Sequence, residues 1–224
     1  MTSNNRPVMS EKQIPRARAQ AVGTKNLGDS ELLALVLGGT QKALEAADRL
    51  LNQFGSLPNV LAAESFELAQ TPGIGFAKSN TLAAVAELSH RKIYPKILGR
   101  TVLSCSDTTR EYLLAKYAHC AVEKFSTIFL NTQHRILGIE ELFQGSISNV
   151  MIYPREVVKR CIARNAASII LVHNHPSGIP EPSRADIHIT RKIRTAVETI
   201  DIQLLDHLIV GESSVCSLAE RGLL

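Results

Sequence analysis

The 224-residue sequence has no tryptophan, only four cysteines and no apolar run close to the ~20 residues that a membrane-spanning helix needs. We therefore expect no contact with a membrane. The first twenty residues, MTSNNRPVMSEKQIPRARAQ, contain no apolar stretch, so we expect a polar arm and not a secretory signal. No two cysteines form a C-x-x-C pair, which is typical of reduced thiols in a cytoplasmic protein. They are Cys105, Cys120, Cys161 and Cys216.

The excess of positive over negative charge is also small, because the net charge is only +4. Residues 1–100 hold 12 Lys and Arg against 8 Asp and Glu, whereas residues 101–224 hold 13 of each. The positive excess therefore lies in the first half of the chain. It favours an acidic partner there, although only weakly, since +4 is a common value for a protein surface.

The first half has few aromatic and β-branched residues, and its apolar residues recur at helical spacing. KALEAADRLLNQFG, for example, places Leu44, Ala47 and Leu51 on one face, with Gly55 as a C-terminal stop. We expect a polar arm over residues 1–14 and a small all-α domain over residues 15–92. Pro95 and Gly99 then indicate a linker over residues 93–106.

The remaining residues, 107–224, alternate between helical and strand patterns and predict a mixed α/β domain. FSTIFLN, ASIILVHNH and QLLDHLIVG are strand candidates, and RILGIEELFQGSI predicts further strands around a hairpin punctuated by Gly138 and Gly145. YPREVVKRCIARN predicts a helix that begins at Pro154, and SRADIHITRKIRTAVETI predicts another.

One loop, HNHPSGIPEPSRAD, carries the most chemistry in the sequence. His173 and His175 lie two residues apart at the end of a predicted strand, so both imidazoles point to the same face. Asp186 follows a stiff, Pro-rich loop and is the candidate third ligand. Two His and one Asp leave a fourth position open, which is the arrangement of a catalytic zinc site, although other divalent metals accept the same ligands. Alternatively, Ser183 and Asp186 form a capping box at the start of a helix.

The loop has the form H-x-H-x7-S-x2-D, which resembles the signature of JAMM (MPN-type) metallo-isopeptidases. The longer stretch, from YPREVV to LLDHLIVG, resembles the bacterial RadC family (UPF0758-type), which carries that domain. The resemblance is close over about residues 100–224 and looser over residues 15–92. It implies a JAMM/MPN-like α/β fold of cytidine-deaminase-like architecture, one zinc per chain, and hydrolysis of a peptide or isopeptide bond in a peptide or protein substrate.

The resemblance also implies a role for each residue of the site. His173, His175 and Asp186 match the metal ligands, and Ser183 matches the serine that supports the oxyanion. The general base is a glutamate just before the first strand of the domain, which corresponds to Glu123. Two rivals, Glu140 and Glu141, remain because one sequence does not fix this alignment. We expect His207 to be a strand residue near the site, with a ligand role as the alternative.

A second motif, TPGIGFAKSN, resembles the helix-hairpin-helix element that RadC proteins carry at this place. Gly73 and Gly75 permit a tight turn whose backbone N–H groups can hold a DNA phosphate without reading the base sequence. Lys78 stands slightly displaced from the usual position of a lysine. The alternative is a plain packing unit. Two functions therefore compete: a zinc hydrolase with DNA association, or a DNA-repair-associated module whose metal site is structural or vestigial.

Overall fold

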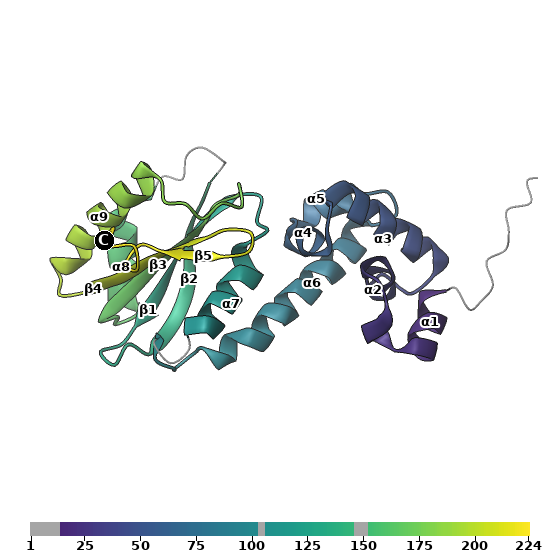
Figure 1. Cartoon of the computed structure of the whole chain (residues 1–224), viewed down its shortest axis with the longest axis horizontal. Coiled ribbons are helices and arrows are strands. Elements are labelled where there is room, and N and C mark those ends of the chain that lie inside the picture. The colour runs from purple at the N-terminus through teal and green to yellow at the C-terminus, as the bar shows by residue number, and fades with distance from the viewer. Residues whose placement is uncertain (1–13, 103–105, 146–151) are drawn as a thin grey trace, which may run out of the picture. The chain divides into compact units, whose positions relative to one another are not determined.

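The computed structural model describes residues 14–102, 106–145 and 152–224. Most of the predicted arm, and Cys105 within the predicted linker, lie outside these ranges. The chain divides into two compact units, Met1–Glu87 and Leu88–Leu224, and each unit is described here by itself (Figure 1). Within the described ranges, no helix is both long enough and apolar enough to cross a membrane.

The first unit is helical. Its longest complete helix, α3, begins after Thr40, whose hydroxyl accepts a hydrogen bond from the Ala43 N–H, and ends at Gly55 with a positive φ of 84°. The apolar side of α3 packs into one core with residues of α2, α4, α5 and α6. The elements are α1 (Pro15–Val22), η2 (Thr24–Asn26), α2 (Asp29–Val36), α3 (Gln41–Phe54), α4 (Leu57–Ala62), α5 (Ser65–Ala69) and α6 (Gly75–Ile93), whose last residues belong to the second unit.

The second unit is an α/β domain with one mixed five-stranded sheet in the order β2-β1-β3-β4-β5. The strands are β1 (Glu123–Leu130), β2 (Ile136–Gly145), β3 (Ser168–Asn174), β4 (Gln203–Val210) and β5 (Val215–Ser217). The β3–β4 pair is parallel and the other pairs are antiparallel. The helical elements are η3 (Tyr94–Lys96), α7 (Ser106–Tyr117), α8 (Pro154–Ala163) and α9 (Arg184–Glu198). The predicted fold class, a helical N-terminal part followed by a mixed α/β domain, is confirmed.

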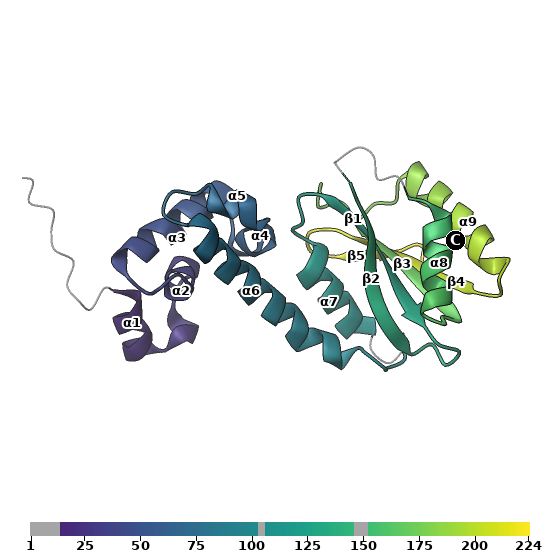
Figure 2. The same cartoon turned by 180° about the vertical axis from the view of Figure 1, so that it is seen from behind.

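Helices cover both faces of this sheet (Figures 1 and 2). On one face, alternate residues of β1 and β3 such as Phe129 and Leu171 form a core with α8 and α9. On the other face, residues such as Ile128 and Val172 form a core with α7. Every residue of β3 is buried, as expected of a central strand covered on both sides. A polar side chain at the end of β3 therefore enters an interior from which water is largely excluded.

A hairpin turn at Gly138 within RILGIEELFQGSI is wrong, and the residues of that stretch after Gly145 lie outside the described ranges. Residues 136–145 form the single strand β2, and Gly138 lies inside it, paired with Phe129. The actual turn is earlier, where the Asn131 side chain accepts hydrogen bonds from the N–H groups of Gln133 and Arg135. The three-residue strand β5 was not predicted, since it is too short to give a periodic pattern. The helix α1 lies within the predicted all-α domain, but its sequence PRARAQAV has too few apolar residues to predict it individually.

Candidate metal centre

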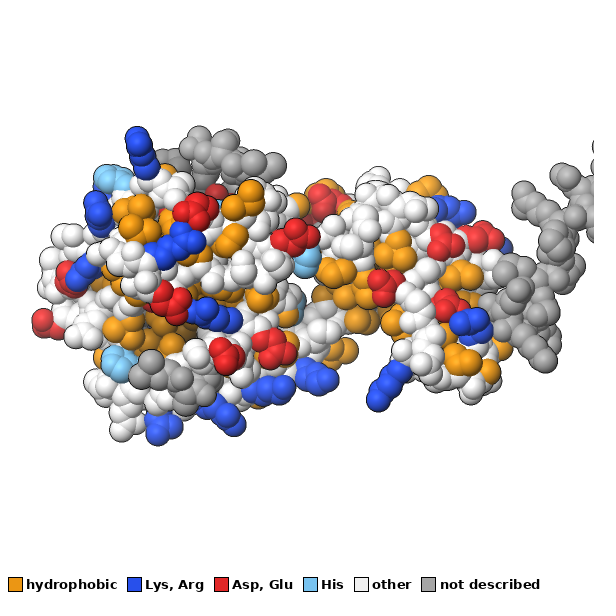
Figure 3. Space-filling view, in the orientation of Figure 1, with side chains coloured by type: hydrophobic (Ala, Val, Ile, Leu, Met, Phe, Trp, Pro, Cys, Tyr) orange, Lys and Arg blue, Asp and Glu red, His pale blue; other side chains and the backbone are white. Residues whose placement is uncertain are grey.

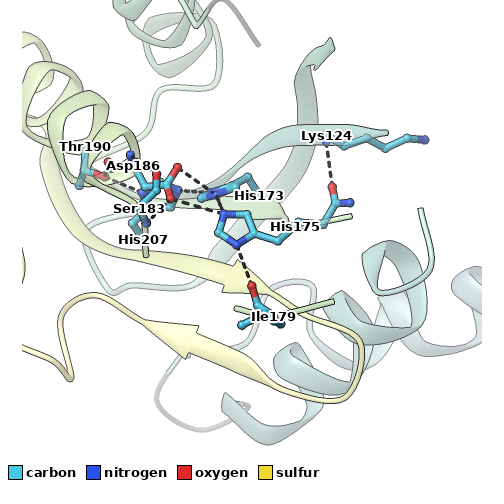
Figure 4. A network of polar contacts seen from close by, with 9 residues as sticks. Lys124, His173, His175, Ile179, Ser183, Asp186, Thr190 and His207 are labelled. Carbon is cyan, nitrogen blue, oxygen red and sulfur yellow. Dashed lines mark hydrogen bonds and ion pairs between the residues drawn. The ribbon is translucent and has the colours of Figure 1, made fainter. Parts of the chain in front are cut away.

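The site lies where β3 ends. His173 is the penultimate residue of β3, and His175 follows the strand with its backbone N–H bonded to the Val210 carbonyl of β4. The chain therefore stays extended through His175, and residues two apart point to the same face. The two Nε2 atoms lie 3.0 Å apart (Figure 4). The structure thus brings together the two imidazoles that the motif predicted.

Asp186 reaches the imidazoles from the first turn of α9. Its Oδ1 lies 3.3 Å from His173 Nε2, and its Oδ2 lies 3.4 Å from His175 Nε2. One ligand atom from each of these three residues lies within 4.8 Å of the others, so the group is able to hold a metal ion. Of the residues that the structure describes, only these three form such a group.

Asp186 also belongs to the capping box. Its Oδ2 accepts from the Ser183 N–H at 2.7 Å, while the Ser183 hydroxyl accepts from the Asp186 N–H at 3.1 Å. The two interpretations of this residue are therefore compatible, because one carboxylate starts α9 and faces the imidazoles. The capping bond fixes the carboxylate at the helix start and so holds it toward the two rings.

The charges at the site depend on one another. Burial alone would raise the pKa of the Asp186 carboxyl, but hydrogen bonds with His173 and His175 hold that pKa far below its usual range. In turn, the hydrogen bond with Asp186 raises the pKa of His175, although partial burial opposes the change. The carboxylate thus remains charged and attracts positive charge, whether a proton or a metal ion, to the space between the rings.

The hydrogen bonds of His175 test whether a metal fits. Its Nδ1 lies 2.8 Å from the Ile179 carbonyl, which only accepts, so Nδ1 carries the proton. In the neutral form of His175, Nε2 therefore carries the lone pair and faces His173 Nε2. A proton or a metal ion between the two Nε2 atoms, which lie 3.0 Å apart, would satisfy both nitrogens. Two imidazole nitrogens and a carboxylate would suit a divalent ion such as zinc.

The Pro-rich loop is held against the turn between β4 and β5. The Gly178 carbonyl accepts from the Glu212 N–H at 2.8 Å, and the Gly178 N–H donates to the His175 carbonyl at 2.9 Å. Gly211 fits only because it has no side chain: a Cβ there would lie 2.5 Å from the Gly178 oxygen. This contact fixes the segment that carries the Ile179 carbonyl, and therefore the orientation of His175.

Glu123 begins β1 on the side of the sheet that carries the imidazoles. Phe125 pairs with His173 and stacks against its ring, so two residues earlier Glu123 comes opposite His175 on the same face. The charge of Glu123 contributes to the raised pKa of His175. The predicted base therefore lies beside the predicted ligands.

The two rival glutamates lie elsewhere. Glu140 is opposite Thr127, farther along β1, and forms ion pairs with Arg160 and Arg164. Glu141 is opposite Ser126, on the other face of the sheet, and its carboxylate lies 3.9 Å from the Lys124 ammonium. Neither of these carboxylates is brought to the imidazoles.

Ser183 and Asn174 also have defined roles in the structure. The Ser183 hydroxyl accepts the capping bond from Asp186, which leaves its own hydrogen for a donor role, and the residue is exposed. Asn174 faces away from the imidazoles. Its side chain accepts from the Lys124 N–H at 2.8 Å and donates to the Val122 carbonyl at 3.1 Å, so it ties β3 to the start of β1.

Sequence patterns alone missed Thr190 and the contacts of His207. His207 Nε2 lies 2.8 Å from His173 Nδ1, and His207 Nδ1 lies 2.6 Å from the Thr190 hydroxyl. One signal was available: Thr190 is four residues after Asp186 on α9, a polar residue on the face that also carries buried Ile193 and Val197. A polar residue on such a face points to a buried polar partner.

In the first unit, the predicted DNA-contact residues lie at the turn between α5 and α6. Gly73 and Gly75 both have positive φ, at 92° and 60°. The Lys78 ammonium donates to the Gly73 carbonyl at 2.7 Å, and a guanidinium nitrogen of Arg49 donates to the Pro72 carbonyl at 3.1 Å. Two cations therefore flank the turn.

Two family models match the chain, each over a different part of it. Residues 103–223 match the model of a RadC-like JAB domain, and residues 8–80 match that of a UPF0758 N-terminal domain. A UPF0758 protein of Marinomonas sp. (strain MWYL1) is 46% identical over 216 residues, covering 95% of this chain and 96% of the relative. A UPF0758 protein of Aliivibrio fischeri (strain ATCC 700601 / ES114) is also 46% identical, over 96% of this chain and 97% of its own.

Proposed function

Because the chain belongs to the UPF0758 family and carries a RadC-like JAB domain, we propose that it is a zinc-dependent hydrolase of the JAMM type that cleaves a peptide or isopeptide bond. One observation carries the proposal. Two imidazole nitrogens face each other at 3.0 Å beside a carboxylate whose oxygens lie within 3.4 Å of them. A set of three protein ligands is more typical of a catalytic zinc site than of a structural site, which has four.

We infer a role for each residue of the site. His173, His175 and Asp186 hold the ion, which supplies Lewis-acid chemistry and makes water a nucleophile near neutral pH. Glu123, opposite His175, takes a proton from the attacking water and delivers it to the leaving nitrogen. Ser183, with its hydroxyl hydrogen available, donates to the oxyanion that develops on the substrate carbonyl.

Metal analysis of the purified protein tests the proposal. We expect about one zinc per chain, in line with an open three-ligand site. The double variant His173→Ala/His175→Ala leaves a single protein ligand and should lose the metal. His188→Ala is the matched control, because His188 is an exposed residue of α9 away from the three ligands. A double variant that retains full zinc would contradict the assignment.

The second candidate function is DNA association, for which the two cations at the α5–α6 turn are the specific observation. In that case the chain is a DNA-repair-associated protein whose metal site is structural or vestigial. Hydrolysis of a peptide library distinguishes the two. Activity that depends on zinc supports the hydrolase, whereas DNA binding by a zinc-loaded but inactive protein supports the alternative.

A further inference from the structure

Behind the candidate ligands lies a buried row of hydrogen bonds that connects α9, β4 and β3. The Thr190 hydroxyl donates to the Asp186 carbonyl at 2.5 Å and contacts His207 Nδ1 at 2.6 Å. His207 Nε2 in turn lies 2.8 Å from His173 Nδ1 (Figure 4). Thr190 and His207 are fully buried, and His173 is 1% exposed. Water therefore has little access to replace any partner in this row.

The direction of every bond in the row follows from chemistry. A carbonyl only accepts, so the single hydroxyl hydrogen of Thr190 is used on Asp186. The Thr190 oxygen must then accept from His207 Nδ1–H. A neutral His207 has no hydrogen left on Nε2, which must accept from His173 Nδ1–H. His173 Nε2 is consequently the nitrogen with the lone pair, and it is the atom that faces His175 and Asp186.

We propose that His207 and Thr190 are positioning residues that hold His173 with its proton on Nδ1 and its Nε2 lone pair directed at the metal. The inference rests on the proposed metal site and goes beyond it. It assigns His207 a role as the hydrogen-bond acceptor of a ligand and not as a ligand, since both of its ring nitrogens are engaged by Thr190 and His173.

The packing of Phe125 supports the same orientation of the His173 and His207 rings. The Phe125 ring lies parallel to His173, with centroids 6.2 Å apart, and meets His207 edge-on at 5.6 Å. Neither imidazole is therefore free to rotate without disturbing the core. The row also connects two ligands, because Asp186 offers its carboxylate to the site and its backbone carbonyl to Thr190. The opposite tautomer of His173 would place a hydrogen between the rings, where the metal must bind.

Removing one hydroxyl tests the row with little change of shape. Thr190→Val should leave His207 Nδ1–H without its acceptor and weaken zinc binding about 10- to 100-fold, the usual effect of losing such a partner. Thr190→Ser keeps a hydroxyl and should bind zinc close to the wild-type level. Thr195→Val is the matched control: Thr195 makes the same kind of bond to its own helix, at 3.0 Å to the Arg191 carbonyl, but is exposed.

Zinc affinity is measured by competition with a chelator, and thermal melting of the zinc-free variants reports any general loss of stability. If Thr190→Val binds zinc as tightly as Thr195→Val, the proposal is overturned. A lower melting temperature of Thr190→Val would not change that conclusion. Should Thr190→Val fail to fold, His207→Gln and His207→Leu replace it. The Gln amide oxygen preserves an acceptor for His173, so His207→Gln should bind zinc more tightly than His207→Leu, and equal affinities would also overturn the proposal.

The protonation of His173 is read directly by ¹⁵N NMR of the imidazole rings in the zinc-free protein. We expect a proton on His173 Nδ1 in the wild type and in Thr190→Ser, and its loss or exchange in Thr190→Val. An unprotonated His173 Nδ1 in the wild type would contradict the inference whether or not zinc binds. Failure of the wild type to bind any zinc, with Nδ1 protonated as expected, would instead remove the proposed function.

Discussion

At the scale of one residue, Asp186 combines a helix cap with the position of a candidate metal ligand. The capping bond to Ser183 needs only a hydrogen-bonding oxygen, whereas a dication needs the negative charge. We predict that Asp186→Asn melts close to the zinc-free wild type but binds zinc more weakly by several orders of magnitude. Thermal melting without zinc and a zinc titration measure the two effects separately.

Asp186→Ala is the companion variant, because it removes both functions. It should lose about 1 kcal/mol of the free energy of unfolding in the absence of zinc, as expected of a lost N-terminal cap. Wild-type zinc affinity in Asp186→Asn would mean that the carboxylate only caps α9. The third ligand would then have to be sought elsewhere.

A second residue-scale prediction concerns Glu123, which lies beside the ligands without belonging to them. Glu123→Gln should keep the fold and the zinc but abolish hydrolysis, because it removes a proton carrier and no ligand. Zinc content, melting temperature and turnover of a peptide substrate are measured together. Glu141→Gln is the control, since Glu141 is on the other face of the sheet and should leave turnover intact. An active Glu123→Gln enzyme would exclude this base.

The sequence motif predicted the three candidate ligands because strand alternation and the capping box are local properties. His173 and His175 share a face in any extended strand, and Ser183 begins a helix through a pattern of four residues. The role of His207 is different. It depends on the pairing of β3 with β4 and on α9 packing over both strands, and a single sequence specifies neither of these.

At the scale of elements, the site depends on how the Pro-rich loop meets the β4–β5 turn. A Cβ on Gly211 would lie 2.5 Å from the Gly178 oxygen and 2.6 Å from the Pro180 Cδ. Gly211→Ala should therefore displace the loop, withdraw the Ile179 carbonyl from His175 and weaken zinc binding about tenfold or more. Overpacking of this kind should also cost about 1–3 kcal/mol of the free energy of unfolding.

Zinc titration and denaturant unfolding of Gly211→Ala check this prediction. Gly138→Ala in β2 is the control, because a Cβ there would make only an ordinary contact, 3.5 Å from the Arg164 guanidinium. Wild-type zinc affinity in Gly211→Ala would show that the loop does not orient His175. Sequence reasoning does not reach this contact, since Gly178 and Gly211 lie in different loops and meet only through the tertiary fold.

For the molecule as a whole, charge gives only a general guide to partners. On the face shown in Figure 3, positive and negative side chains are interspersed over the α/β unit. The positive excess before residue 101 comes from residues 88–100, which hold four basic and no acidic residues, whereas residues 1–87 hold eight of each. Lys78 and Arg49 flank the α5–α6 turn, so any contact of DNA with this turn is expected to depend on these two cations and not on the overall charge of the first unit.

We predict that the full chain binds duplex or branched DNA weakly and without sequence preference, and that affinity falls steeply with salt because phosphate contacts release counterions. Gly73 and Gly75 have positive φ, so valine there would strain the turn itself; charge removal is the cleaner change. Lys78→Gln and Arg49→Gln should each lower the slope of log affinity against log salt by about 1. Lys25→Gln, which removes an exposed charge of the same unit, is the control and should change the slope less.

Fluorescence anisotropy over a salt series measures these slopes, and the His173→Ala/His175→Ala variant should bind DNA as the wild type does. If the wild-type chain fails to bind even at low salt, or the Lys78 and Arg49 variants keep the wild-type slope, the turn is a packing element.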